Sequence, residues 1–276
     1  LREVEYVHET SPAGSALFTS LHSEEIERAP LDFLEQFDYA VVFTRRRDSL
    51  FAVNIEKVIP HTEIIITIPP QGVESHVSQF RLNQLAFGGE SVDLKSKLTI
   101  PSPYREKARE FLVSSSCTEG SGPLIAFHPG SGGKRKCWPL KNYFRLVEKL
   151  VNRQACRILF HTGPAEEPEV ADEILGFAHG HRRVVHVRNE PLIMVASLLA
   201  ACDLYVGNDS GISHLGAAVS GKVIVLFGPT DPLLWKPTGT GVEVISAGIC
   251  EDPLAGLSVD EVYVRLTFRL EQAARE

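Results

Sequence analysis

The feature that most constrains this sequence is the regular alternation of short apolar runs with amphipathic stretches. This alternation is typical of parallel α/β units, in which a helix returns the chain to the start of the next strand. The order of the runs therefore predicts a doubly wound parallel sheet in the second half of the chain. Ligands of such sheets lie outside the carboxyl ends of the strands. Five strands are expected there, at Leu124–His128, Cys156–His161, Val184–Val187, Leu204–Val206 and Val223–Phe227.

Helices are expected between these strands. The segment 140–152 has apolar residues at three- and four-residue spacing, which forms one stripe of a helix. Further helices are expected at about 167–177, 191–201 and 211–219. Ser258 and Glu261 have the spacing of a capping box, which predicts the start of a last helix.

The first half shows the same alternation. Strands are expected at Val4–Val7, Asp38–Thr44 and Glu63–Ile68, and helices at about Ser75–Phe87 and Tyr104–Val113. The small, polar stretch 114–122 has the composition of an interdomain linker. Because 276 residues are a comfortable length for two domains, we predict an N-terminal domain at 1–116 and a C-terminal domain at 117–276.

Charge and composition exclude several classes of protein. The formal net charge is −7, whereas a nucleic-acid-binding protein normally has a basic surplus, so no nucleic-acid partner is expected. No apolar run approaches the length of a membrane-spanning helix. The five cysteines are scattered and form no C-x-x-C pair, which favours reduced thiols in a cytoplasmic protein over disulfides or zinc.

Polar clusters follow the first two predicted strands of the second half. The loop 128–139 is rich in Gly and Ser and contains three successive cations, so its backbone N–H groups can approach an anion closely. A solvated basic loop has the same composition. After the next strand, Glu166 can accept hydrogen bonds from ribose hydroxyls or an adenine amine. Alternatively, Glu166 and Glu167 complement the N-terminal dipole of the following helix.

The best-marked cluster is Gly207-Asn208-Asp209-Ser210-Gly211, followed by a helix that carries His214. Free N–H groups at Ser210 and Gly211 are expected to point at an anion, to which His214 adds a donor. Asp209 either caps the helix or accepts hydrogen bonds from ligand hydroxyls. In the simpler alternative, Asp209 or Ser210 is only an N-cap and His214 is a surface histidine.

Two further polar segments have no single interpretation. The turn 228–232, after the strand Val223–Phe227, either lines the pocket or redirects the chain. The run Arg45-Arg46-Arg47 follows a predicted strand end and is either a solvated loop or a holder of phosphates on an anionic acceptor. Trp138 and Trp235 are expected to be packing residues.

Taken together, the second half resembles the ADP-heptose:lipopolysaccharide heptosyltransferase family, glycosyltransferase family 9. Four motifs carry this resemblance, in the same order as in the family. They are His128-Pro129-Gly130-Ser131 with Lys136-Cys137-Trp138-Pro139; Thr162-Gly163-Pro164-Ala165-Glu166; Val206 to Gly211 with His214-Leu215; and Leu226-Phe227-Gly228-Pro229-Thr230-Asp231-Pro232.

The resemblance implies a GT-B fold, with two Rossmann-like domains that face a cleft. It implies inverting transfer of heptose from ADP-heptose to the inner core of lipopolysaccharide, with no metal and no cofactor. The ADP-sugar donor lies on the C-terminal domain, and the lipid-linked oligosaccharide acceptor lies on the N-terminal domain. The protein is then expected in the cytoplasm, at the inner face of the inner membrane and in peripheral contact with it.

The resemblance also assigns donor-binding residues. Ser131 and Gly132 would contact the diphosphate, Lys136 would balance its charge, and Glu166 would contact the ribose. The remaining four would contact the sugar and phosphates: Asp209, Ser210, Gly211 and His214. Gly132 stands where the family often has a hydroxyl-bearing residue.

One departure concerns the catalytic base, which in the family is an aspartate in a Gly-Asp loop after the first strand. The chain starts on Leu1, at what corresponds to the second strand, and that loop is not found. We therefore expect the base in a missing N-terminal segment and assign no catalytic residue. Two alternatives remain: a non-catalytic nucleotide-sugar binding protein, and another GT-B-like enzyme that acts on a different nucleotide sugar.

Overall fold

The computed structural model describes residues 19–85, 97–115, 122–153, 155–248 and 253–273. The chain divides into two compact units, Leu1–Asp93 and Leu94–Glu276, each of which is described by itself. The strand expected at Val4–Val7 lies outside the described residues. None of the helices in the described part is long and apolar enough to span a bilayer.

The N-terminal unit contains a two-stranded parallel sheet, in which β1 (Tyr39–Thr44) pairs with β2 (His61–Ile66). The connection is α3 (Leu50–Val58), whose first turn is capped by the Ser49 hydroxyl. The other helices are η1 (Ser20–His22), α2 (Arg28–Leu34) and α4 (Val77–Leu82). The strands expected at Asp38–Thr44 and Glu63–Ile68 are therefore present, and with α3 they form a β-α-β unit. Its core consists of Leu21, Leu34, Val42, Ala52, Ile55, Ile59 and Ile64.

The C-terminal unit contains a six-stranded parallel sheet with the order β5-β4-β3-β6-β7-β8. The order reverses beside β3, so β3 and β6 are the strands at the topological switch point. The predicted doubly wound sheet is confirmed, with one additional edge strand, β8. The strands are β3 (Leu124–His128), β4 (Arg157–Thr162), β5 (Val184–Arg188), β6 (Leu204–Asn208), β7 (Val223–Phe227) and β8 (Val242–Ser246).

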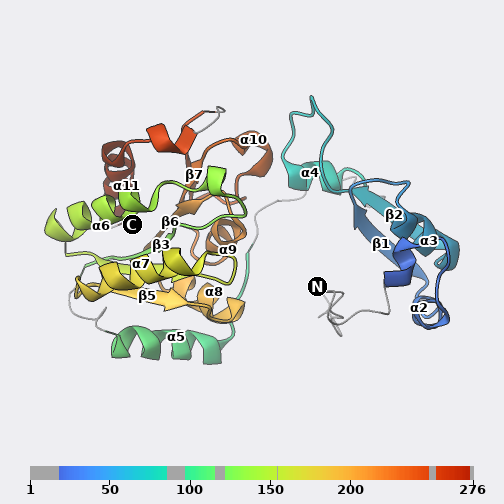
Figure 1. Cartoon of the computed structure of the whole chain (residues 1–276), viewed down its shortest axis with the longest axis horizontal. Coiled ribbons are helices and arrows are strands. Elements are labelled where there is room, and N and C mark those ends of the chain that lie inside the picture. The colour runs from blue at the N-terminus through green and yellow to red at the C-terminus, as the bar shows by residue number, and fades with distance from the viewer. Residues whose placement is uncertain (1–18, 86–96, 116–121, 154, 249–252, 274–276) are drawn as a thin grey trace. The chain divides into compact units, whose positions relative to one another are not determined.

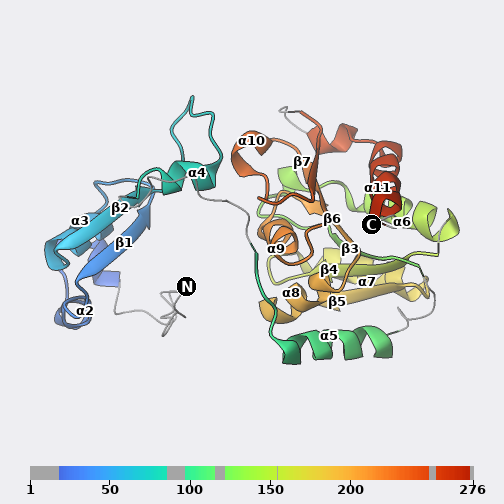
Figure 2. The same ribbon diagram turned by 180° about the vertical axis from the view of Figure 1, so that it is seen from behind.

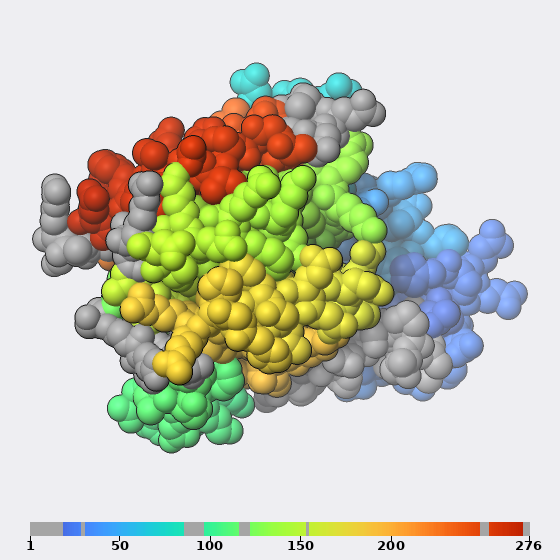
Figure 3. All heavy atoms as spheres, turned by 60° about the vertical axis from the view of Figure 1, so that its left-hand side comes forward, coloured from blue at the N-terminus to red at the C-terminus, as the bar shows by residue number. Residues whose placement is uncertain are grey.

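Helices cover both faces of this sheet (Figures 1 and 2). One face carries α6 (Leu140–Arg153), α7 (Pro168–His179) and α11 (Val259–Ala273), which lie side by side in Figure 3. The other face carries α5 (Ser102–Ser114), α8 (Leu192–Ala200) and α9 (Gly211–Val219). The short helices are η3 (Lys134–Lys136), α10 (Pro232–Trp235) and η4 (Pro253–Gly256).

The continuous apolar runs of the central strands follow from this double coverage. In β3, Ile125 and Phe127 pack on one helix layer, and Leu124 and Ala126 pack on the other. A strand that is buried on both faces needs an apolar residue at every position, not at alternate positions. The sequence LIAFH therefore predicts a central strand, and β3 is buried throughout.

The division between the units lies earlier in the chain than the boundary predicted at residue 116. The reason is α5, which packs against α8 through Ala108, Phe111 and Leu112 and so belongs to the C-terminal unit. The polar stretch after α5 connects this helix to β3 within one unit.

Candidate ligand site at the switch point of the C-terminal sheet

A cavity of about 770 Å³ opens within the C-terminal unit, where the loops after β3, β4 and β6 meet. Helices α8 and α9 supply an apolar part of its lining through Leu192, Val195, Ile212 and Leu215. Six of the eight predicted donor-binding residues line the same cavity: Ser131, Gly132, Glu166, Ser210, Gly211 and His214. The polar clusters that the sequence places on separate strand ends are thus brought to one site.

The start of α9 presents backbone donors to this cavity. Ser210 is the N-cap, and its hydroxyl accepts a hydrogen bond from Ser213 N. In the described part of the chain, the N–H groups of Gly211 and Ile212 have no acceptor, and both residues line the cavity. Free amides at a helix start, with the helix dipole behind them, favour an anion.

Asp209 does not cap the helix; it joins three loops. Its Oδ2 accepts hydrogen bonds from Lys136 Nζ at 2.7 Å and from Thr230 Oγ1 at 2.6 Å. Its backbone carbonyl accepts a 2.6 Å hydrogen bond from Ser131 Oγ. The carboxylate is almost fully buried, so these donors replace the water that it loses. Lys136 and Asp209 therefore stabilise the wall of the site as a pair.

Asn208 has a structural role that the sequence motifs do not indicate. It is fully buried, its Nδ2 donates to Pro129 O at 2.7 Å, and its Oδ1 accepts from Trp138 N and Tyr143 Oη at 3.0 and 3.1 Å. The available signal was an amide at the end of an otherwise apolar strand, because a buried amide must find partners. Asn208 fixes the loop after β3 to β6. Trp138 is a buried packing residue, as expected.

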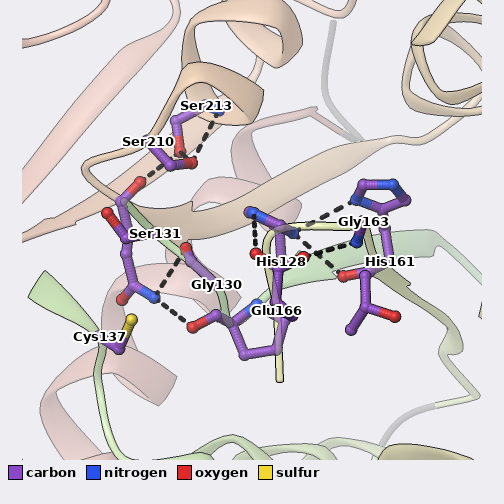
Figure 4. A network of polar contacts seen from close by, with 12 residues as sticks. His128, Gly130, Ser131, Cys137, His161, Gly163, Glu166, Ser210 and Ser213 are labelled. Atoms are coloured by element: carbon purple, nitrogen blue, oxygen red, sulfur yellow. Dashed lines mark hydrogen bonds and ion pairs between the residues drawn. The ribbon is translucent and has the colours of Figure 1, made fainter. Parts of the chain in front are cut away.

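Glu166 points at the cavity, whereas Glu167 lies at the start of α7. Glu166 Oε2 accepts a hydrogen bond from Gly163 N at 2.5 Å, and Oε1 lies 3.8 Å from Nε2 of His128 (Figure 4). Glu167 occupies the N-cap position of α7 and forms an exposed ion pair with Lys134. The helix-dipole interpretation therefore fits Glu167, and the ligand-contact interpretation stays open for Glu166.

Three neighbouring strands each carry a histidine: His128 in β3, His161 in β4 and His186 in β5. His128 Nδ1 lies 3.1 Å from His161 O and 3.3 Å from His161 Nδ1, and His186 Nε2 lies 2.8 Å from Thr162 Oγ1. Burial lowers the pKa of His128. Burial also lowers the pKa of His161 to about 3 and that of His186 to about 4. All three rings are therefore neutral near pH 7.

These neutral histidines predict that the C-terminal unit loses stability as the pH falls. The unfolded chain protonates each ring near pH 6.5, whereas folded His161 does so only near pH 3. Below about pH 6.5 the unfolded state therefore binds more protons, and the free energy of unfolding decreases. The slope due to His161 alone approaches about 1.4 kcal/mol per pH unit. Urea titrations between pH 7 and pH 5, followed by tryptophan fluorescence, measure it.

The matched variant is His161→Gln, which removes the titrating ring. We expect the decrease of unfolding free energy with falling pH to be shallower in this variant than in the wild type, by about 1 kcal/mol per pH unit. Equal slopes in the two proteins would contradict the assignment of His161 as a buried neutral histidine.

In the N-terminal unit, Arg46 follows β1 and forms an exposed bidentate pair with Asp48, at 2.9 and 2.7 Å. This pair fits the solvated-loop interpretation of the arginine run. A phosphate-binding role for Arg45, Arg46 and Arg47 stays a prediction. Across the described ranges, no three His, Cys, Asp or Glu side chains are grouped so that they could hold a metal ion.

Comparison with known proteins matches residues 66–254 to the model of glycosyltransferase family 9 (heptosyltransferase). Lipopolysaccharide heptosyltransferase 2 of Salmonella typhimurium is 32% identical over 159 residues, and that of Escherichia coli K12 is 33% identical over 159 residues. Both matches cover 55% of this chain and 45% of the relative. The matched region therefore spans about half the length of these relatives.

Two solved structures share the fold. One is E. coli ADP-heptose lps heptosyltransferase II, with a TM-score of 0.70, 21% identity, and coverage of 88% of this chain and 80% of that chain. The other is E. coli heptosyltransferase WaaC with ADP, with a TM-score of 0.63, 20% identity, and coverage of 88% and 76%. The expected α/β class and the GT-B fold are confirmed by this likeness.

Proposed function

The chain belongs to glycosyltransferase family 9, and we propose that it transfers heptose from ADP-heptose to the inner core of lipopolysaccharide. The observation that carries this proposal is the convergence of six expected donor-binding residues on one cavity at the switch point. Doubly wound sheets bind nucleotides at this place. On this proposal the C-terminal unit holds the ADP-sugar, and the N-terminal unit takes part in binding the lipid-linked acceptor.

Each wall of the cavity suits one part of the donor. The free N–H groups of Gly211 and Ile212 bind phosphate oxygens. The hydroxyl of Ser131 is engaged by Asp209, so Ser131 contacts the diphosphate through its backbone, as does Gly132. His214 adds a donor from α9, and Glu166 accepts from the ribose.

Lys136 supplies positive charge to the departing ADP. A lysine ammonium has three donors, and Asp209 engages one of them. The others are left for phosphate oxygens, where a cation and a helix start stabilise negative charge that develops as the sugar leaves. We propose that the transfer is inverting and needs no metal. The same proposal puts the protein in the cytoplasm, at the membrane surface where a lipid-linked acceptor lies.

A methyl group at position 130 tests the role of Glu166. A Cβ at Gly130 would lie 2.0 Å from Glu166 Oε1, which is closer than any real contact. The same Cβ would lie 2.5 Å from Cδ and 2.9 Å from Cγ of Glu166, so the whole end of this side chain must move. Because these atoms belong to one flexible side chain and not to the backbone, we expect Gly130→Ala to displace the carboxylate without unfolding the protein. Loss of the hydrogen bond that Glu166 is proposed to accept from the ribose should weaken ADP binding about 5- to 30-fold, as measured by isothermal titration calorimetry.

The matched control for this variant is Gly133→Ala. No atom lies within 4 Å of a Cβ at Gly133, and its φ of −170° is accessible to any residue. We expect its ADP affinity to equal that of the wild type. Equal affinities of Gly130→Ala and Gly133→Ala would remove Glu166 from the donor site.

The test of the overall function is mass spectrometry of heptose-deficient lipopolysaccharide core incubated with the full-length protein, ADP-heptose and a chelator. We expect the core to gain the mass of one heptose. Binding of ADP-heptose without transfer would favour a non-catalytic nucleotide-sugar binding protein. Release of free heptose, or of an epimer in the absence of acceptor, would favour another GT-B-like enzyme.

A further inference from the structure

Two hydrogen-bond acceptors lie next to each other in the wall of the cavity. They are Oε1 of Glu166 and Nε2 of His128, a residue to which the proposed function assigns no donor contact. Nε2 of His128 lies 3.8 Å from Oε1 of Glu166, and both residues line the cavity (Figure 4). Their side chains are 4% and 8% exposed. Among the described residues, no hydrogen-bond donor engages either atom.

The surroundings of His128 determine which ring nitrogen carries its proton. Nδ1 lies 3.1 Å from the carbonyl oxygen of His161, and a carbonyl oxygen only accepts hydrogen bonds. The neutral ring therefore has its hydrogen on Nδ1, because a lone pair there would face another lone pair. Nδ1 of His161, at 3.3 Å, is then a second acceptor for the same N–H. Nε2 of His128 is left as an acceptor.

A second proton on Nε2 would turn it into a donor to Glu166, and burial opposes this. Burial lowers the pKa of His128, and this effect is larger than the opposite effect of the Glu166 charge. Near neutral pH the cavity therefore presents two acceptors, one neutral and one negatively charged, with no donor between them. Unpaired acceptors in a largely buried place cost free energy until a ligand supplies donors.

Two acceptors 3.8 Å apart fit a ligand that has two donors on adjacent atoms. A vicinal diol has this arrangement, since each hydroxyl can donate to one acceptor. The ribose of a ribonucleotide carries such a diol, and a deoxyribose lacks one of the two hydroxyls. A site built to accept from a hydroxyl rejects an analogue that lacks it, because the buried acceptor then stays unpaired.

We propose that His128 is a specificity-determining residue of this site, whose Nε2 accepts from one hydroxyl of the donor's vicinal diol while Glu166 Oε1 accepts from the other. The site then selects ribonucleotides against deoxyribonucleotides with two separate acceptors. His161 is the positioning residue, since its carbonyl and its ring hold the His128 proton on Nδ1. This inference rests on the proposed nucleotide-sugar site and adds a residue to it.

Two substitutions of His128 distinguish the effect of losing the acceptor at Nε2 from the effect of losing the packing of the ring. His128→Asn puts an amide near the position of Nδ1, so it keeps the donor to His161 O and has no atom at the position of Nε2. His128→Gln reaches the position of Nε2 and can restore the acceptor there. The experiment measures the affinities of the wild type and both variants for ADP, 2′-deoxy-ADP and 3′-deoxy-ADP by isothermal titration calorimetry. Thermal melting of each protein without ligand controls for folding.

The wild type is expected to bind ADP about fivefold or more tightly than either deoxynucleotide. In His128→Asn, one of these two preferences should fall to within twofold, and the other, which depends on Glu166, should persist. His128→Gln should regain the lost preference. This pattern cannot come from packing alone, since packing would weaken all three nucleotides equally.

The inference is overturned if His128→Asn keeps both preferences, or if it weakens ADP and both analogues by the same factor. These outcomes leave the donor site itself in place, because ADP still binds. Failure of the wild type to bind ADP at all is a different result, which overturns the proposed function and not only the role of His128.

Discussion

Replacing Asn208 with alanine is expected to lower the free energy of unfolding of the C-terminal unit by about 3–5 kcal/mol. The side chain lies in a fully buried place, where its Nδ2 donates to Pro129 O and its Oδ1 accepts from Trp138 N and Tyr143 Oη. Burial raises the pKa of Tyr143 well above its ordinary value, so its hydroxyl remains a donor. The substitution leaves all three partners unpaired, and each unpaired buried group costs about 1–3 kcal/mol.

Urea denaturation followed by tryptophan fluorescence measures this effect. Both tryptophans, Trp138 and Trp235, lie in the C-terminal unit, so the signal reports on that unit alone. The matched control is Asn152→Ala on the exposed side of α6, which should change stability by no more than about 0.5 kcal/mol. A loss below about 1 kcal/mol in Asn208→Ala would show that Asn208 does not hold the loop after β3 in place.

Replacing Lys136 with alanine is expected to weaken ADP binding by about 1.5–3 kcal/mol, which corresponds to about 10- to 150-fold in affinity. The ammonium group is partly buried and pairs with a nearly buried Asp209. On the proposed function, the substitution removes a cation from beside the donor phosphates. It also leaves the Asp209 charge with Thr230 as its remaining side-chain donor. That negative charge then opposes the diphosphate.

The control for this variant is Lys134→Ala, two residues away in η3. Lys134 is highly exposed and pairs with an exposed Glu167, so its charge is screened by water and salt. Isothermal titration calorimetry at two salt concentrations should show Lys134→Ala within about twofold of the wild type. Wild-type affinity in Lys136→Ala would remove Lys136 from the donor site.

The central strands could be predicted from the sequence because each is buried on both faces. β3, β7 and α9 begin and end at the predicted residues, Leu124–His128, Val223–Phe227 and Gly211–Val219. The edge strand β8 (Val242–Ser246) was not predicted, because it is largely half-buried and includes Glu243, which pairs with Arg265 and Arg269 of α11. An edge strand has a weaker apolar signal than a central one.

The positions of the loops of the site could be predicted from the sequence, but the hydrogen bonds between these loops could not. Glycine, serine and charge after a strand end indicate where an anion can bind, and this information is local. The contacts of Asn208 with Pro129, and of Asp209 with Lys136, join residues more than 70 positions apart. Spacing in one sequence does not encode such pairs. For the same reason the sequence does not reveal that Asp209 pairs with Lys136 and Thr230. A contact of Asp209 with donor hydroxyls stays a prediction.

If the loops after β3, β4 and β6 form one donor-nucleotide site, saturating ADP should change hydrogen–deuterium exchange in all three of them. We predict slower exchange at the free amides of Gly211 and Ile212, and in segments 130–133 and 163–166, with no change in α11. Unchanged exchange in all three loops while ADP is bound, or protection confined to α11 or the N-terminal unit, would contradict the account.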